Sequence, residues 1–264
     1  MIIMKNTIRR LITFFGYEIS ARVYPRLIPH AEYDRALSIV KASTMLPNTR
    51  LASLYDQVRH CERISMEGSI VECGVWKGGA IGLIALALKQ SAEQKIRHLH
   101  LFDSFTDICP PDPLVDGQLA IDELGQGSES RPNASPQPVI GAYDSVGGHG
   151  TMAECSDLIE MRIGYPSSHV HFHVGWFHDT VPAASSEIGP IALLRLDGDW
   201  YASTKVCLDY LYEHVVEGGF VIIDDYGTYE GCRKAVDEFI ARRGIRTFMH
   251  RVDASCYYFQ KPGC

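Results

Sequence analysis

Acidic residues follow two apolar runs of this sequence, at the points where buried strands would end. Asp197 and Asp199 come after "LLRL", and Asp224 and Asp225 come after "FVII". Parallel strands end at one edge of a sheet, so these carboxylates would crowd together unless a cation lay between them. Carboxylate oxygens and water suit Mg²⁺. We predict that Asp197, Asp224 and Asp225 hold this ion. Asp199 would lie behind them or cap a helix, and capping is the alternative for all four acids.

A glycine-rich turn follows an earlier strand, in "VECGVWKGGA" at residues 71–80. Doubly wound folds bind nucleotides at such a turn, but its spacing is not the G-x-G-x-x-G of a dinucleotide site. An acid two residues before the first glycine suits a cationic or hydrogen-bond-donating ligand, which favours S-adenosylmethionine over NAD. A tight packing turn is the alternative. The residues that we expect to form the cofactor site here are Glu72, Gly74, Val75, Gly78 and Gly79.

Two further segments extend the predicted cofactor site. Asp103 ends the next strand in "LFDSF", where its carboxylate would accept hydrogen bonds from the ribose hydroxyls, with Ser104 beside it. His178 and Asp179, in "GWFHDT", follow a later strand. We expect that they shape the cofactor pocket, and we include Asp179 among the residues that bind the cofactor.

If the cofactor is S-adenosylmethionine, an acceptor that loses a proton needs a general base, for which the sequence offers two candidates. His149, in "GGHGTM", is the first and Asp197 is the second. A solvent-facing loop residue is the alternative for His149. His169, His171 and His173 share one face of a strand, and we interpret them as a half-covered strand face rather than a metal cluster.

The elements that carry these residues alternate between strands and helices from residue 69 onward. Strands are expected at 69–75, 97–105, 169–175, 191–197, 218–225, 247–253 and 256–260, the last two as a hairpin. This order predicts an α/β fold with a doubly wound, mostly parallel seven-stranded sheet. Residues 1–65 would form a helical cap and residues 66–264 the catalytic domain. Its insertion at 107–150 is rich in Pro, Gly and Ser, which predicts a lid, with a disordered insertion as the alternative.

Composition excludes several classes of protein. The chain of 264 residues has 25 basic and 32 acidic residues, a formal charge of -7, which argues against a nucleic acid partner. Eight cysteines without a CxxC pair, and no recognisable signal peptide, predict a reduced, cytoplasmic protein. The apolar runs are shorter than the ~20 residues that span a bilayer.

The amino-terminal segment, residues 1–16, has the pattern of a basic amphipathic helix. We expect it to pack on its own domain or on a partner subunit, and we expect a homo-oligomer. The alternative for this segment is weak peripheral contact with the inner face of the membrane.

Five motifs together resemble the macrocin O-methyltransferase family, the sugar O-methyltransferases of macrolide and aminocoumarin antibiotics. They are "VECGVWKGGA", "LFDSF", "GWFHDTVP", "LLRLDGDWYAST" and "GGFVIIDDYG", and the likeness covers residues 40–255. The resemblance implies the Rossmann-like fold of class I methyltransferases, S-adenosylmethionine as cofactor, and Mg²⁺ held by Asp197, Asp224 and Asp225. It also implies a sugar hydroxyl as acceptor.

The acceptor would be a glycosylated natural product or a surface glycan. The stretch from Pro110 to His149 departs from the family pattern, which leaves the acceptor's identity open. A metal-dependent phosphoesterase and an inactive S-adenosylmethionine-binding module are the alternatives.

Overall fold

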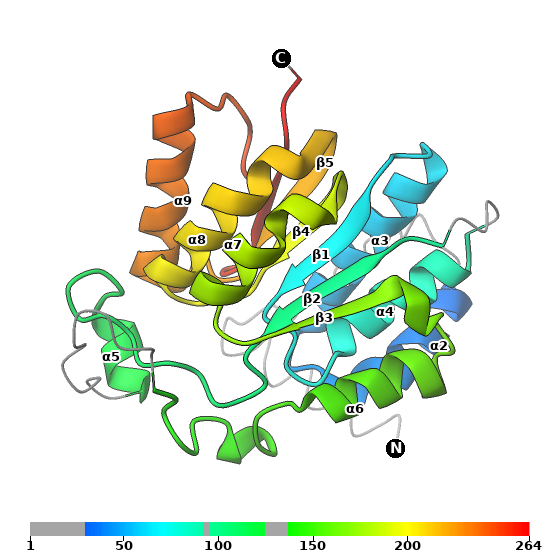
Figure 1. Ribbon diagram of the computed structural model, residues 1–264, viewed down its shortest axis with the longest axis horizontal. Coiled ribbons are helices and arrows are strands. Elements are labelled where there is room, and N and C mark those ends of the chain that lie inside the picture. Colours follow the sequence, from blue (N-terminus) through cyan, green and yellow to red (C-terminus); the bar gives the residue numbers. More distant parts are fainter. Residues whose placement is uncertain (1–29, 92–95, 125–136, 264) are drawn as a thin grey trace, which may run out of the picture.

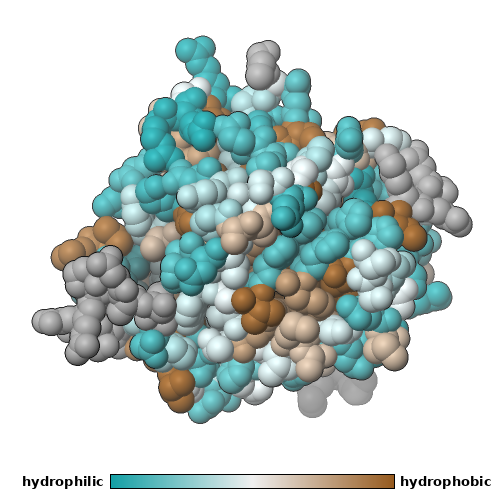
Figure 2. All heavy atoms as spheres, viewed as in Figure 1, coloured by the Kyte–Doolittle hydropathy of each residue, from teal (hydrophilic) through white to brown (hydrophobic). Residues whose placement is uncertain are grey.

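The structure is a computed structural model that describes residues 30–91, 96–124 and 137–263. The segment at 1–16 therefore lies outside the described residues. None of the described helices is long and apolar enough to cross a membrane. The face shown in Figure 2 is mostly hydrophilic, and its hydrophobic residues form small separate groups.

Seven strands form one sheet in the order β3-β2-β1-β4-β5-β7-β6. The first five are parallel, and β7 and β6 are added antiparallel at one edge. The predicted fold, a mostly parallel seven-stranded α/β sheet, is confirmed. The strands are β1 (Ser69–Cys73), β2 (Leu99–Asp103), β3 (Val170–Val174), β4 (Ile191–Leu196), β5 (Val215–Ile223), β6 (His250–Arg251) and β7 (Tyr257–Gln260).

Helices cover both faces of the sheet (Figure 1). The helices α2, α3 and α4 pack on one face, and α7, α8 and α9 pack on the other. The helices are α2 (His30–Val40), α3 (Asn48–Arg63), α4 (Gly79–Lys89), α5 (Gln118–Leu124), α6 (Met152–Ser156), α7 (Phe177–Ile188), α8 (Tyr201–Leu211) and α9 (Glu230–Arg243).

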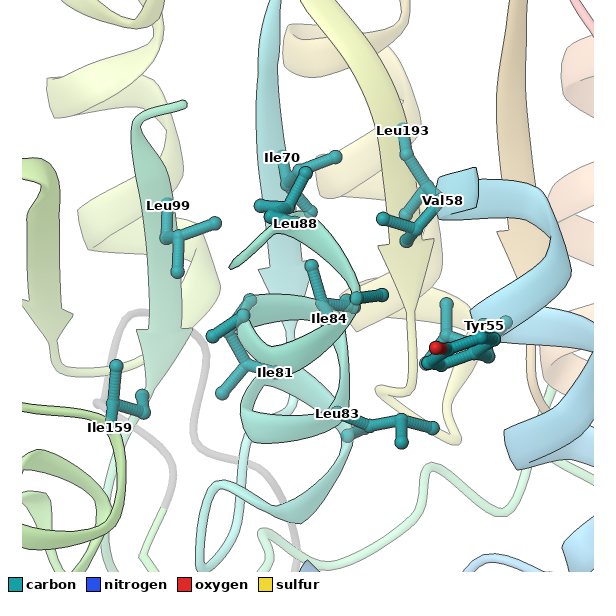
Figure 3. Close-up of a cluster of buried hydrophobic side chains, with 14 of the residues drawn as sticks. Tyr55, Val58, Ile70, Ile81, Leu83, Ile84, Leu88, Leu99, Ile159 and Leu193 are labelled. Atoms are coloured by element: carbon teal, nitrogen blue, oxygen red, sulfur yellow. The ribbon is translucent and has the colours of Figure 1, made fainter. Parts of the chain in front are cut away.

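The central strands are apolar almost throughout because both of their faces are buried. Every residue of β1 and β4 is buried. Successive side chains alternate between the two layers, so that Ile70 packs toward α4 and Val71 toward α8. Figure 3 shows Ile70 with Leu88 and Ile84 of α4 in one buried cluster. Burying each such side chain stabilises the fold by about 1.5–3 kcal/mol.

The predicted helical cap belongs to the same core as the sheet. Tyr33 of α2, and Tyr55 and Val58 of α3, are buried in one cluster with the α4 side of the sheet. The position of Tyr55 and Val58 beside α4 can be seen in Figure 3. The two described helices of the cap therefore complete one layer of the domain.

Several elements differ in detail from the sequence-based expectation. The predicted lid contains α5, so it is not a loop throughout. The helix expected at 151–163 begins with a capping box between Thr151 and Glu154, and it continues as a π-helical turn, Asp157–Arg162. The strand expected at 247–253 is paired only at β6, which has two residues.

Strand order reverses between β1 and β4. The chain builds β1, β2 and β3 outward in one direction, and then starts again beside β1 with β4 and β5. In open α/β sheets, the carboxyl ends of the two strands at such a reversal border a crevice that binds ligands. The lid and α5 lie beside these strand ends (Figure 1).

Candidate active site

A cavity of about 490 Å³ lies at the carboxyl ends of β1, β2 and β4. Its walls come from the turn after β1, the end of β2, the lid, the start of α7 and the segment between β4 and α8. The position is the one at which the reversal of strand order predicts a ligand. Among the residues used below, those that line it are Gly74, Trp76, Asp103, Ser104, Tyr143 and Asp197.

The turn after β1 requires glycine at its first position. Gly74 has a φ of +91°, and a Cβ atom there would lie 1.9 Å from the carbonyl oxygen of Asp197. A side chain would collide with the backbone of β4, which cannot move without breaking the sheet. Glycine therefore lets the ends of β1 and β4 approach each other at the cavity.

Three other predicted members of this turn lie outside the cavity lining. Gly78 precedes α4 in a left-handed conformation, with a φ of +82°. A Cβ atom on Gly79 would lie 2.4 Å from the carbonyl oxygen of Ser43, so this glycine serves the contact between α4 and the preceding segment. Val75 is buried, and its backbone N–H donates to Asp103.

Asp103 holds the turn through its carboxylate. Oδ2 accepts hydrogen bonds from the backbone N–H groups of Val75 and Trp76 at 2.6 and 2.9 Å, and Oδ1 accepts one from Phe105 at 2.7 Å. Burial raises the pKa of Asp103, and these three hydrogen bonds oppose the rise. A carboxylate has about four lone-pair positions, so about one remains for a ligand beside Ser104.

Backbone strain is concentrated around this cavity. Trp76, Phe105 and Asp199 are not glycine, yet they have φ values of +50°, +51° and +57°. Trp76 and Asp199 line the cavity, and Phe105 follows the lining residue Ser104. A left-handed conformation costs a residue with a side chain roughly 1–2 kcal/mol, and such strain gathers at functional sites.

Three carboxylates meet on the β4 and β5 side of the cavity. Oxygens of Asp197, Asp199 and Asp225 all lie within 4.8 Å of one another. Burial, followed by the charge of Asp197, raises the pKa of Asp199 to about 8. Oδ2 of Asp225 is buried without a hydrogen-bond partner among the described residues. Crowded carboxylates with an unsatisfied oxygen fit a hard divalent cation.

The negative charge of Asp224 is instead balanced by two guanidinium groups. Its Oδ1 accepts a hydrogen bond from Arg195 Nη2 at 2.8 Å, and its Oδ2 accepts one from Arg50 of α3. Both residues lie in the turn that follows β5, where Asp224 meets Arg50 of α3 and Asp225 meets Asp197 and Asp199. The cluster therefore differs from the predicted ligand set in one member, with Asp199 in the position that we assigned to Asp224.

Arg195 connects the predicted cofactor turn to the acids. It is 2 % exposed, and it donates to Glu72 Oε1 at 2.7 Å, to Asp197 Oδ2 at 2.9 Å and to Asp224. Burial alone lowers the pKa of Arg195, but the charges of Asp197, Asp224 and Glu72 raise it well above its usual value. The arginine is therefore a fixed positive charge between the two halves of the site.

Glu72 faces this arginine rather than the cavity. It is completely buried, which raises the pKa of Glu72 to about 7 although Arg195 opposes the rise. Within the described residues, its Oε2 has no hydrogen-bond partner. Sequence reasoning missed both Arg195 and Arg50. A charged residue inside the apolar run "IALLRLD" was the available signal for Arg195, because a buried guanidinium needs carboxylate partners.

The lid closes over the turn at its carboxyl-terminal end. Trp76 Nε1 donates to the carbonyl oxygen of Gly148 at 3.1 Å, and Lys77 Nζ donates to that of Gly147 at 2.7 Å. A Cβ atom on Gly150 would lie 2.1 Å from the carbonyl carbon of Trp76. Glycines therefore allow the lid backbone to lie directly on the turn.

The amino-terminal part of the lid is attached to the start of α8. Asp116 is 2 % exposed, and its carboxylate accepts hydrogen bonds from the backbone N–H groups of Tyr201 at 2.7 Å and Asp112 at 2.6 Å. Trp200 Nε1 donates to the carbonyl oxygen of Cys109 at 2.9 Å. Both described parts of the lid thus have specific partners on the domain.

The comparisons with known proteins agree with this architecture. The sequence profile described as macrocin-O-methyltransferase (TylF) matches residues 33–131 and 161–261. The chain belongs to this family. It is therefore an O-methyltransferase, as the sequence predicts. The family profile leaves out residues 132–160, which include the carboxyl-terminal part of the lid.

Several O-methyltransferases of known name are similar to this family member over most of its length. Mycinamicin III 3''-O-methyltransferase of Micromonospora griseorubida is 30% identical over 83% of this chain and 79% of its own. The 8-demethyl-8-(2,3-dimethoxy-alpha-L-rhamnosyl)-tetracenomycin-C 4'-O-methyltransferase of Streptomyces olivaceus is also 30% identical, over 83% of this chain and 76% of its own. The solved structure of the O-methyltransferase NovP is 30% identical, with a TM-score of 0.68 over 84% of this chain and 83% of NovP.

Two predicted site residues of this family member lie away from the cavity lining. His149 is 42% exposed, and its Nδ1 is 3.9 Å from Asp107 Oδ1. The side chain of Asp179 is 66% exposed and lies 3.3 Å from His178 Nε2. In contrast, His178 itself lines the cavity. The lid residues Glu123 and Tyr143 both line the cavity, and the pKa of Tyr143 is raised by burial and by the charges of Asp199 and Asp197.

Two aromatic residues of the cavity wall were also missed in the sequence. Trp176 and Phe177 follow β3 and begin α7, and both line the cavity. Their signal was the pair "WF" directly after a strand end, because aromatic faces at the mouth of a nucleotide site can stack on a base.

Proposed function

We propose that this protein transfers a methyl group from S-adenosylmethionine to a sugar hydroxyl, with Mg²⁺ bound by Asp197, Asp199 and Asp225. The observation that carries the proposal is the group of three carboxylates at the edge of the cavity, next to the turn at Gly74. A sugar acceptor is supported by the name of the tetracenomycin relative, which includes a rhamnosyl group. A phosphoesterase would have no use for the methyltransferase architecture of the family.

The cofactor would occupy the side of the cavity formed by the turn after β1. Trp176 and Phe177 would stack on the adenine, and the remaining acceptor position of Asp103 would bind a ribose hydroxyl. Gly74 leaves room for close approach of the ligand to the backbone. S-adenosylmethionine supplies a methyl group on a sulfonium centre, which an acceptor oxygen held about 3 Å away can attack in line.

The acid cluster would prepare the acceptor. A Mg²⁺ ion there would polarise the acceptor hydroxyl and lower its pKa. The proton would pass to Asp197, the candidate base that lines the cavity. Its Oδ2 is held by Arg195 Nη2 at 2.9 Å, which fixes the direction of the carboxylate. Exclusion of water would fall to the lid, through the contacts of Gly147 and Gly148 with the turn.

The experiment is methyl transfer to a panel of glycosides, nucleotide-linked sugars and lipid-linked glycans, with Mg²⁺ or with EDTA. We expect EDTA to abolish turnover, and Asp199→Asn and Asp225→Asn to lower it by about 10²-fold or more, because the ion's activation of the hydroxyl is worth several kcal/mol. Binding of S-adenosylhomocysteine, measured by calorimetry, should change little. Full turnover in EDTA would exclude the metal mechanism.

A titration of Mg²⁺ into the variants Asp199→Asn and Asp224→Asn separates the two possible ligand sets. If Asp199 is a ligand and Asp224 is not, the Mg²⁺ affinity of Asp224→Asn stays close to that of the wild type while that of Asp199→Asn falls. The reverse result would restore Asp224 as a ligand. If the protein bound NAD but not S-adenosylhomocysteine, the assignment of S-adenosylmethionine as the cofactor would be wrong.

A further inference from the structure

A group of histidines lies on one face of the sheet at its β2 and β3 edge, far from the carboxylate cluster in the chain. We call it the histidine ladder; its members are His98, His100, His169, His171 and His173. His100 pairs directly with His171 in the parallel register. Strand β3 is the edge strand of the sheet, and within the ladder His98 is exposed while His100 is buried.

The rings of the ladder are arranged in two ways. Residues directly opposite each other are stacked, with ring centroids 4.6 Å apart for His98 and His169 and also for His100 and His171. Diagonal neighbours instead point nitrogens at each other. Nδ1 of His98 lies 2.8 Å from Nε2 of His171, and Nδ1 of His100 lies 3.2 Å from Nε2 of His173.

These diagonal distances are close to those of two imidazoles on one metal ion. A Zn–N bond is about 2.0–2.1 Å long, so two ligands of a tetrahedral ion have nitrogens about 3.3 Å apart. At present one nitrogen of each pair donates its hydrogen to the other. If that hydrogen moved to the far nitrogen of the same ring, both facing nitrogens would carry lone pairs, and a small rotation of the two rings would aim them at one ion without release of a proton.

The imidazoles of the ladder are also in the neutral form that a cation needs. Burial, together with the neighbouring rings, lowers the pKa of His100 to about 3 and lowers those of His171 and His173. Neutral imidazole is the form that binds metal. His98 is exposed, which gives an ion from solvent a first ligand.

We propose that the histidine ladder binds divalent transition ions such as Zn²⁺ at two places. One ion would lie between His98 and His171 and one between His100 and His173, and water would complete the coordination of each. Imidazole prefers zinc, nickel and copper, whereas carboxylates and water prefer magnesium, so the ladder and the carboxylate cluster would select different ions. An ion bound by both strands would fasten the edge strand β3 to β2. The nearer pair would do so three residues before Asp103, whose end of β2 borders the cavity.

The test is calorimetric titration of Zn²⁺ into tag-free protein that has been stripped with EDTA and dialysed into excess Mg²⁺, which occupies the carboxylates. We expect saturable binding whose stoichiometry falls by about half in the double variant His98→Gln with His171→Gln, which leaves the pair of His100 and His173 intact. Zn²⁺ should also raise the melting temperature of the wild type more than that of the variant. His250→Gln, on the opposite edge strand β6, is the matched control and should bind Zn²⁺ like the wild type.

Three outcomes would overturn the proposal. They are the absence of saturable binding at about 1 mM Zn²⁺, equal binding by the double variant, and loss of binding in Asp225→Asn but not in the double variant. Unchanged binding of S-adenosylhomocysteine by the double variant checks that it is folded.

Discussion

Asp224 and Asp225 are neighbours in the chain, yet their carboxylates meet different partners. Asp224 is bound by Arg50 and Arg195, and Asp225 lies with Asp197 and Asp199. Both residues lie in the turn directly after β5, where the backbone directs the two side chains to different partners. Two adjacent acidic residues after a strand can therefore have different roles. One forms ion pairs within the protein, and the other is available to a ligand.

Replacing Asp224 with Asn should destabilise the metal-free protein by about 3 kcal/mol, because two guanidinium groups would lose a buried counter-charge. The matched variant Asp199→Asn removes one of three crowded carboxylates, so its stability should be unchanged or higher. The free energy of unfolding in urea with EDTA measures both. A more stable Asp224→Asn than Asp199→Asn would mean that the pairing with arginine does not stabilise the fold.

At the scale of elements, the turn after β1 is fixed from three directions. Asp103 binds its backbone from β2, the carbonyl oxygen of Asp197 closes it from β4, and the lid lies on Trp76. None of these contacts is local in the chain. The turn is therefore rigid only in the complete domain, and its shape depends on the space left by Gly74.

Gly74→Ala should reduce both stability and binding of S-adenosylhomocysteine, because it combines a φ of +91° with a Cβ atom placed against backbone. Gly148→Ala is the matched control. Its φ is +85°, but its Cβ atom would meet no described atom within 4 Å, so it should cost only the roughly 1–2 kcal/mol of the left-handed conformation. Chemical denaturation and calorimetry measure the two effects. Equal losses in both variants would show that collision with β4 does not matter.

At the scale of the whole molecule, an ion pair joins α3 to the carboxyl-terminal hairpin. Arg50 Nε donates to Asp253 Oδ2 at 2.8 Å across 203 residues of sequence. Oδ1 of Asp253 accepts hydrogen bonds from the backbone N–H groups of Ser255 and Cys256. Burial raises the pKa of Asp253, but Arg50 and the backbone N–H groups lower it more, so that it lies below its usual value.

Asp253→Ala should lower the free energy of unfolding by about 1.5–3 kcal/mol at pH 7, through loss of charge-assisted hydrogen bonds. Because the folded pKa is depressed, this contribution is present above the unfolded value of about 3.9 and is lost as the pH falls through the folded value. The difference from wild type should therefore persist from pH 8 to 5 and shrink below about pH 4. Urea unfolding across this range tests it, with Asp122→Ala on α5 as the control. A difference that grows in acid would contradict the assignment.

The sequence alone determined the elements and their order. Short apolar runs rich in β-branched residues, such as "SIVEC" and "IALLRL", indicate strands buried on both faces, and their alternation with helices favours a parallel sheet. That topology brings strand ends to one edge, so the order of the elements is enough to assign the acids and the turn at Gly74 to one site. The local pattern was sufficient for this assignment because the spacing of apolar residues and the order of the elements are properties of the sequence itself.

Only the tertiary structure decided which atoms of that site meet. The pairing of Asp224 with Arg50, the burial of Glu72 against Arg195, and the presence of Tyr143 rather than His149 in the cavity wall depend on segments far apart in the chain. A side chain's direction follows from the residue at which its strand ends and from the charges packed against it. Those charges come from α3, β4 and the lid, whose positions are fixed by the packing of the whole core.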